Sequence, residues 1–143
     1  MTVKQLSVFI ENREGRLGEV LHVLKKSDVN ILSMSLADTT EYGLLRLIVS
    51  DPKLGKEKLA EDGFSTMLTD VIVLKINHEA GSLQGLLGIL SESDINIEYM
   101  YAFANGADAS AVLKSDNPEK VVEILKRNGF DVYSADEAYH ANI

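Results

Sequence analysis

A glycine and an asparagine recur at the same spacing in the two halves of the chain, as Gly15 with Asn30 and as Gly81 with Asn96. Each glycine precedes an amphipathic segment with helical periodicity. Unpaired N–H groups and the positive end of a helix dipole are therefore expected beside it, where they suit a carboxylate. Glycine also lets the backbone approach a ligand closely. Each asparagine carries an amide that accepts a hydrogen bond from an ammonium and donates one to a carboxylate. Together these groups complement a zwitterion such as an amino acid.

The side chains around the two glycines differ between the halves. The first loop contains Arg13 and Arg16, which can bind a carboxylate through two hydrogen bonds. The second loop has Glu79 and Ser82 at the same positions, so two sites would differ in preference. His78 also lies in this loop, where a ligand contact and a solvated histidine are both open interpretations. Each charge-assisted hydrogen bond contributes roughly 1.5 to 3 kcal/mol, so a few suffice for micromolar binding.

Purely structural interpretations stay open for the same residues. Asn30 and Asn96 suit a turn from helix to strand, which Asx-type hydrogen bonds would stabilise. Gly15 and Gly81 can equally be ordinary loop glycines. Aromatic residues at alternate positions of a later strand could line a pocket that accepts an aromatic ligand, or they could pack in an interface: Tyr99, Tyr101 and Phe103.

The elements that must position these residues follow from hydrophobic periodicity. Residues 4–10 alternate as a half-buried strand does, whereas Leu17, Val20, Leu21 and Leu24 form the apolar stripe of a helix. Alternation resumes over residues 29–36 and 44–49. Asp51 and Pro52 are typical of a helix start, with a helix to residue 62 that Gly55 weakens, and residues 64–68 close the unit. The order is strand, helix, strand, strand, helix, strand.

The pattern repeats with an offset of 66 residues, as Gly15 and Gly81, or Pro52 and Pro118, illustrate. The sequence therefore predicts two domains, residues 1–69 and 70–143, each a ferredoxin-like βαββαβ unit of the α+β class. In this topology the four-stranded antiparallel sheet has both helices on one face, because crossovers are right-handed. Thr69 and Asp70 alone would separate the units, which predicts rigid coupling. The edge strands, residues 31–36 and 97–103, are expected to pair with each other or with a second chain, which favours a homodimer.

Bulk properties exclude several classes of function. The net charge of −8 offers no basic surface for nucleic acid or an anionic membrane. No segment has the roughly 18 uninterrupted apolar residues of a spanning helix, and no secretory signal is recognisable. The absence of cysteine predicts a cytoplasmic location. His22 and His140 lack partners at metal-ligand spacing, so neither a metal nor another cofactor is expected.

These features resemble the ACT domain, the small-molecule-sensing module of amino-acid metabolism. They are a glycine-ended loop after the first strand, a Gly-x-Leu-x-x-(Leu/Val)-Leu helix and an Asp-aliphatic-Asn-Ile strand start. The resemblance covers nearly the whole chain as two units. It implies that an amino acid binds between this loop of one unit and the second strand of a neighbouring unit. Glu14 and Ala80 stand where the family often has proline. The implied ligand-binding residues are Asn12, Arg13, Glu14, Gly15, Arg16, Leu17, Asn30 and Ile31 in the first half, and Asn77, His78, Ala80, Gly81, Ser82, Leu83, Asn96 and Ile97 in the second.

The function expected from the sequence is that of a free-standing amino-acid sensor, not an enzyme, whose liganded state is recognised by a partner enzyme or regulator. One alternative is a ligand-free interaction module that pairs its edge strands. A more remote alternative is a small acylphosphatase-like hydrolase of the same topology, which would need Arg13 or Arg16 to bind an anion. No nucleophile and base occur in a recognisable catalytic order.

Overall fold

In the computed structural model, which describes residues 2–11, 13–38, 41–77, 79–105 and 108–140, the chain forms two compact units. The N-terminal unit comprises Lys4–Thr69 with Tyr139 and His140. The C-terminal unit comprises Asp70–Ala138 with Thr2 and Val3. The two units are described one at a time below.

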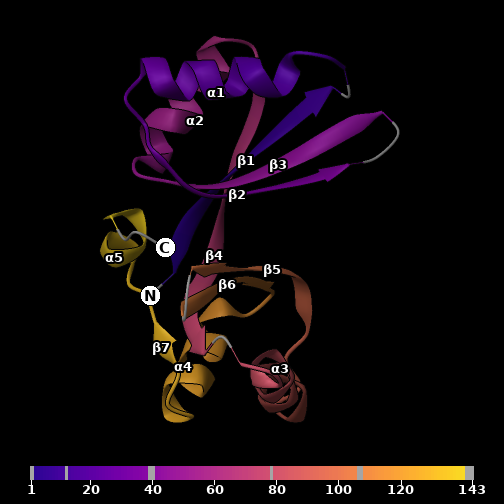
Figure 1. The fold of residues 1–143 in the computed structure, drawn as a ribbon, viewed down its shortest axis with the longest axis vertical. Coiled ribbons are helices and arrows are strands. Elements are labelled where there is room, and N and C mark those ends of the chain that lie inside the picture. Colours follow the sequence, from indigo (N-terminus) through magenta and orange to yellow (C-terminus); the bar gives the residue numbers. More distant parts are fainter. Residues whose placement is uncertain (1, 12, 39–40, 78, 106–107, 141–143) are drawn as a thin grey trace. The chain divides into compact units, whose positions relative to one another are not determined.

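The N-terminal unit has two helices over one face of an antiparallel sheet (Figure 1). Its elements are β1 (Val3–Glu11), α1 (Arg16–Lys26), β2 (Ile31–Asp38), β3 (Tyr42–Val49), α2 (Pro52–Glu61) and the first residues of β4 (Ser65–Asn77). Strand β3 lies between β2 and β1. Alternate residues of the strands face the helices, so Leu6 and Val8 of β1 pack with Val20 and Leu24 of α1 in one buried core.

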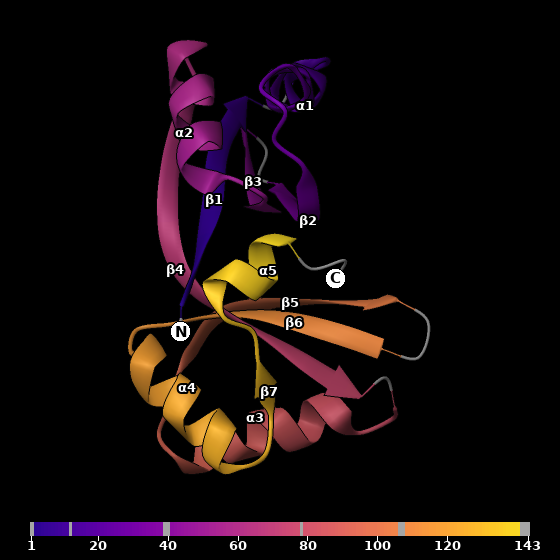
Figure 2. The same cartoon turned by 90° about the vertical axis from the view of Figure 1, so that its left-hand side faces the viewer.

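The C-terminal unit repeats this arrangement (Figure 2). Its elements are the rest of β4, α3 (Ser82–Glu92), β5 (Ile97–Asn105), β6 (Asp108–Ser115), α4 (Pro118–Arg127) and β7 (Asp131–Val132), followed by α5 (Ala135–His140). Strand β4 pairs with both β6 and β7, and β5 pairs with β6. The core again joins the helix-facing residues of the strands, such as Ile72 and Leu113, to Leu86 and Leu125 of the helices.

The strand register repeats along with the order of elements. Leu6 is paired with Leu47 in the N-terminal unit, and Ile72 with Leu113 in the C-terminal unit. The irregularity between Ile31 and Ser33 of β2 recurs between Ile97 and Tyr99 of β5. The predicted α+β class is therefore confirmed: the chain consists of paired ferredoxin-like units, with antiparallel sheets covered by helices on one face.

Two details differ from the sequence-based description. Thr69 and Asp70, expected as a spacer, lie inside β4, which runs uninterrupted from Ser65 to Asn77. Gly55, expected to weaken α2, is buried, and a Cβ there would lie 3.2 Å from Leu6 Cδ2 and 3.3 Å from Leu24 Cδ2. The glycine therefore permits α2 to pack closely against β1 and α1.

The last helix, α5, is an element that the hydrophobic pattern did not reveal. The backbone N–H of Glu137 donates to Ser134 Oγ, and the N–H of Ser134 donates to Glu137 Oε1, both at 3.2 Å. This reciprocal pair is a capping box, which starts a helix by satisfying two otherwise unpaired N–H groups. Among the described residues, every helix falls short of the length and apolar character that a membrane crossing requires.

Candidate functional site

The two helices that follow the predicted binding loops begin differently from the other two long helices. Helices α1 and α3 start at Gly15 (φ 83°) and Gly81 (φ 88°), both left-handed and without a side-chain cap. Helices α2 and α4 start at Asp51 and Asn117, whose side chains accept hydrogen bonds from the first turn. Because L side chains rarely adopt such a φ, glycine is strongly favoured at positions 15 and 81. The N–H groups of Arg16 and Ser82 donate to the backbone carbonyls of Arg13 and Glu79, at 3.4 and 3.2 Å. The next N–H groups of each first turn receive no capping side chain, so they can bind an anion.

The repeated Asp-aliphatic-Asn-Ile segment ends α1 and α3. Asp28 has a left-handed φ of 57°, and its N–H donates to Lys25 O at 3.1 Å. The N–H of Val29 donates to Leu24 O at 2.9 Å. These two bonds form a Schellman motif, which satisfies carbonyls at the end of the helix. Asp94 and Ile95 repeat the motif in the C-terminal unit. The first two residues of the segment therefore have a structural task.

Asn30 and Asn96 follow these motifs and are exposed. The backbone of Asn30 is held by Ser50, whose Oγ accepts from Asn30 N at 2.9 Å and whose N–H donates to Asn30 O at 2.9 Å. Within the described part of the chain, neither asparagine side chain forms a hydrogen bond, so the Asx-type interpretation gains no support there. Both amides are therefore available for a ligand.

The glycine and asparagine of one unit lie at opposite ends of a helix. Helix α1 has 11 residues, which spans about 16 Å at the usual rise. Asn30 and Ile31 instead line a cavity of about 440 Å³ at the corner between α1 and β2, together with Leu21, Leu24, Lys25, Asp28 and Val29. A single unit therefore does not bring Gly15 and Asn30 to one small ligand.

A second cavity, of about 300 Å³, lies beside the start of α3 in the C-terminal unit. Three residues implicated by sequence line it, namely Asn77, Ser82 and Leu83, together with Glu79 of the same loop. Its remaining walls are Ile76, Ala102, Phe103 and Ala109. Sequence reasoning named only Phe103 among them, as a residue that could line a pocket or pack in an interface. The signal was present in the repeat, because Ala102 stands 66 residues after Leu36 and is much smaller. Ala80, Gly81, Asn96 and Ile97 are outside this lining.

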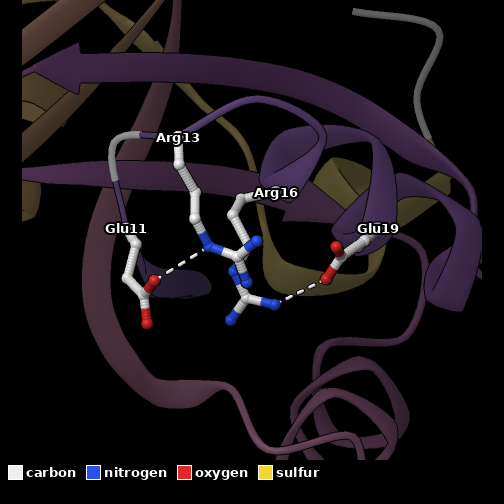
Figure 3. Close-up of polar contacts among 4 residues, drawn as sticks. All are labelled: Glu11, Arg13, Arg16 and Glu19. Carbon is white, nitrogen blue, oxygen red and sulfur yellow. Dashed lines mark hydrogen bonds and ion pairs between the residues drawn. The ribbon is translucent and has the colours of Figure 1, made fainter.

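The two arginines of the first loop turn toward carboxylates of the N-terminal unit (Figure 3). Arg13 Nε lies 2.9 Å from Glu11 Oε2 at the surface. Arg16 Nη1 lies 2.5 Å from Glu19 Oε2, and its guanidinium carbon lies 4.3 Å from the centre of the Phe64 ring. The Arg16 side chain is only 17% exposed, and its Nε is buried without a hydrogen-bond partner among the described residues. Arg16 is thus packed in the fold, whereas Arg13 is free to exchange partners at the surface.

The remaining implicated residues vary in accessibility. Glu14 is exposed, and Leu17 is half-buried against the core of its unit. Asn12 and His78 lie outside the described residues. Across the described ranges, no group of three or more His, Cys, Asp or Glu side chains is placed to hold a metal ion.

Comparison with known proteins identifies the family. Residues 1–141 match the model of the ACT domain pair. The protein BT0572 from Bacteroides thetaiotaomicron is 39% identical, with 98% of this chain and 97% of that chain covered and a TM-score of 0.94. The fold also resembles the regulatory subunit of aspartate kinase from Thermus thermophilus, at 14% identity, 90% and 94% coverage and a TM-score of 0.65. The comparison with curated proteins gives no match. The chain belongs to the ACT domain family, as a pair of ACT domains.

Proposed function

We propose that this ACT domain pair is a regulatory protein that binds an amino acid and has no catalytic activity of its own. ACT domains are regulatory rather than catalytic, and they typically bind amino acids. The observation that carries the proposal is the cavity beside α3, where the apolar walls meet Asn77, Glu79 and Ser82 next to an uncapped helix start. These groups complement an ammonium, a carboxylate and an apolar side chain on one carbon.

The complete site, in this proposal, needs two ACT units. Gly15 and Asn30 lie at opposite ends of α1, as Gly81 and Asn96 do for α3. A ligand that contacts a glycine loop and an asparagine must therefore take them from different units. We propose that a second copy of the chain supplies the missing half, which makes the active form a homodimer. Strands β2 and β5 are suited to the contact, because each is an end strand of its sheet.

The regulatory output passes to another protein, in the cytoplasm. Residues 1–141 match the ACT domain pair, and ACT domains are regulatory, which supports transmission of the ligand signal through a surface of this pair. In the Thermus proteins the same fold forms the regulatory subunit of an enzyme. A partner enzyme or regulator that recognises the liganded form is therefore the proposed receiver.

Isothermal titration calorimetry with the twenty amino acids tests the proposal. At least one should bind with micromolar to millimolar affinity and raise the melting temperature. Asn96→Ala should weaken binding at least about tenfold if the amide makes a charge-assisted hydrogen bond. The control is Gln84→Ala, because Gln84 is an exposed residue of α3 that lines no cavity described above. A complete panel without heat or thermal shift would overturn the proposed function.

The edge strands also support a second candidate, a ligand-free module that assembles by strand pairing. Strands β2 and β5 are the two end strands in the strand order β2-β3-β1-β4-β6-β5. Native mass spectrometry distinguishes the two functions. An oligomer that forms without ligand and is unchanged by every amino acid favours the module, whereas a ligand-dependent shift favours the sensor.

A further inference from the structure

We propose that the cavity of the C-terminal unit selects amino acids with uncharged, aliphatic side chains, and that Ala102 is its specificity-determining residue. The apolar part of its lining is called the alanine pocket and consists of Ile76, Leu83, Ala102, Phe103 and Ala109. This inference rests on the proposed function and adds the class of ligand and the unit that recognises it.

The size and chemistry of the cavity limit what it can accept. Its volume of about 300 Å³ is at the low end for small-molecule sites, which suits a single amino acid. Ile76 and Ala109 are buried, whereas Leu83 and Ala102 are exposed, and Glu79 is the charged residue of the cavity lining. A charged side chain placed against Ile76 and Ala109 would exchange part of its hydration for contact with apolar atoms, which is unfavourable. The three polar residues of the lining are Asn77, Glu79 and Ser82, and they all belong to the end of β4, the following loop or the first residue of α3.

The N-terminal unit shows why this pocket is specific to one repeat. The positions of Ala102 and Ala109 are occupied there by Leu36 and Gly43. A Cβ on Gly43 would lie 3.3 Å from Leu36 Cδ1 and 3.0 Å from Ile10 Cγ1. The Leu36 side chain therefore lies over the glycine, in the space that Ala102 leaves open in the other unit.

A second residue near the cavity, Ser82, also differs in size between the two units. The position of Ser82 is held by Arg16 in the N-terminal unit. The Arg16 guanidinium stacks on Phe64 and pairs with Glu19, so this long side chain occupies space next to its position at the start of α1. The shorter Ser82 has no comparable reach, and it lines the cavity. Two small-for-large exchanges at equivalent positions thus accompany the pocket beside α3.

The strand register confirms that Leu36 and Ala102 occupy equivalent positions in the two units. Leu36 and Ala102 have the same place in their sheets, because Leu36 is paired with Leu45 and Ala102 with Ala111, again 66 residues further on. The pair Leu36 and Gly43 is thus replaced by the pair Ala102 and Ala109. The N-terminal unit consequently shows which side chains fill this place without disturbing the fold.

Calorimetry on the full chain with leucine, valine, methionine, aspartate and lysine tests the selection. The aliphatic amino acids should bind at least about tenfold more tightly than aspartate and lysine. Ala102→Leu should lower leucine affinity at least about tenfold. The double variant Ala102→Leu/Ala109→Gly copies the pair found in the N-terminal unit, so it keeps the test valid if the single variant fails to fold. Gln84→Ala is the control, because Gln84 is an exposed residue of α3 outside the cavity lining, and it should leave leucine affinity unchanged.

The outcomes separate this inference from the proposed function. Binding of aspartate or lysine as tight as that of leucine would overturn the selection but leave an amino-acid sensor. Wild-type leucine affinity in the folded double variant would overturn the role of Ala102 and of the alanine pocket. If no amino acid binds the wild-type chain, both the proposed function and this inference fail.

Discussion

Asp28 and Asp94 have the same left-handed backbone conformation, with φ of 57° at each, although they lie in different units. Each occupies the position that Gly63 and Gly129 hold at the ends of α2 and α4. The four long helices therefore share one type of C-terminal motif. Its left-handed residue is glycine after α2 and α4 and aspartate after α1 and α3. Aspartate tolerates this conformation better than most residues, but glycine adopts it without steric cost.

Replacing these aspartates with glycine should stabilise the protein. Asp28→Gly and Asp94→Gly are each expected to raise the free energy of unfolding by about 0.5 to 1 kcal/mol, because relief of the left-handed conformation outweighs the added freedom of the unfolded chain. Urea denaturation measures the change. Gly63→Ala and Gly129→Ala are the reciprocal controls and should destabilise by about 1 to 2 kcal/mol. A loss of stability in both aspartate variants would contradict the strain argument.

Arg16 should matter for stability more than Arg13. The Arg16 side chain stacks on Phe64 and is mostly buried, so Arg16→Ala should lower the free energy of unfolding by about 1 to 2 kcal/mol. Arg13→Ala should change it by less than about 0.5 kcal/mol, because its ion pair with Glu11 is exposed. Chemical denaturation of both variants provides the comparison. Equal effects would show that the stacking contributes nothing measurable.

Much of the fold was predictable, because it depends on signals that are local or repeated. Strand alternation, the helical stripe and Asp51 with Pro52 are local, and the structure contains the strands, helices and cap that they indicate. The resemblance to the ACT domain rested on the order of these signals, and the family match over residues 1–141 confirms it. The proposed binding residues of the two loops remain predictions that binding experiments must test.

Other features depend on information that hydrophobic patterns do not carry. Helix α5 has six residues, too few for a helical stripe, and its sequence signal is the capping pair Ser134 and Glu137. Asp70 is of a type uncommon in strands, yet it lies within β4. The alanine pocket arises from side-chain volume that is missing at Ala102. The 66-residue repeat already aligns Leu36 with Ala102, but the strand register is needed to show that they have the same place in their sheets.

Acid should weaken the start of α5. Hydrogen bonds from Ser134, through its side chain first and its backbone N–H second, hold the pKa of the exposed Glu137 carboxyl below its ordinary value of 4.5. A lowered folded-state pKa means that this contribution is fully present above pH 4.5 and is lost as pH falls through the folded-state pKa. NMR titration of the Glu137 carboxyl carbon should give a midpoint below 4.5. In Glu137→Gln the amide signals of α5 should lose their acid dependence, and a midpoint at or above 4.5 would contradict the capping box.

Gly43 and Leu36 should be energetically coupled. Gly43→Ala places a Cβ 3.0 Å from Ile10 Cγ1 and 3.3 Å from Leu36 Cδ1, so it should lower the free energy of unfolding by about 1 to 3 kcal/mol. Leu36 is 46% exposed. Leu36→Ala alone should therefore lower the free energy of unfolding by about 1 kcal/mol, which is less than the loss of a fully buried leucine costs.

The double variant Leu36→Ala/Gly43→Ala then decides whether the two positions act as a pair. It reproduces the alanines found at 102 and 109, so the methyl group at position 43 gains room that the leucine had occupied. Its loss of stability should be smaller than the sum of the single losses by at least about 0.5 kcal/mol. Urea denaturation of the four proteins completes the cycle. If the two losses of stability simply add, Leu36 does not restrict position 43, and the close contact with Ile10 alone explains the cost of Gly43→Ala.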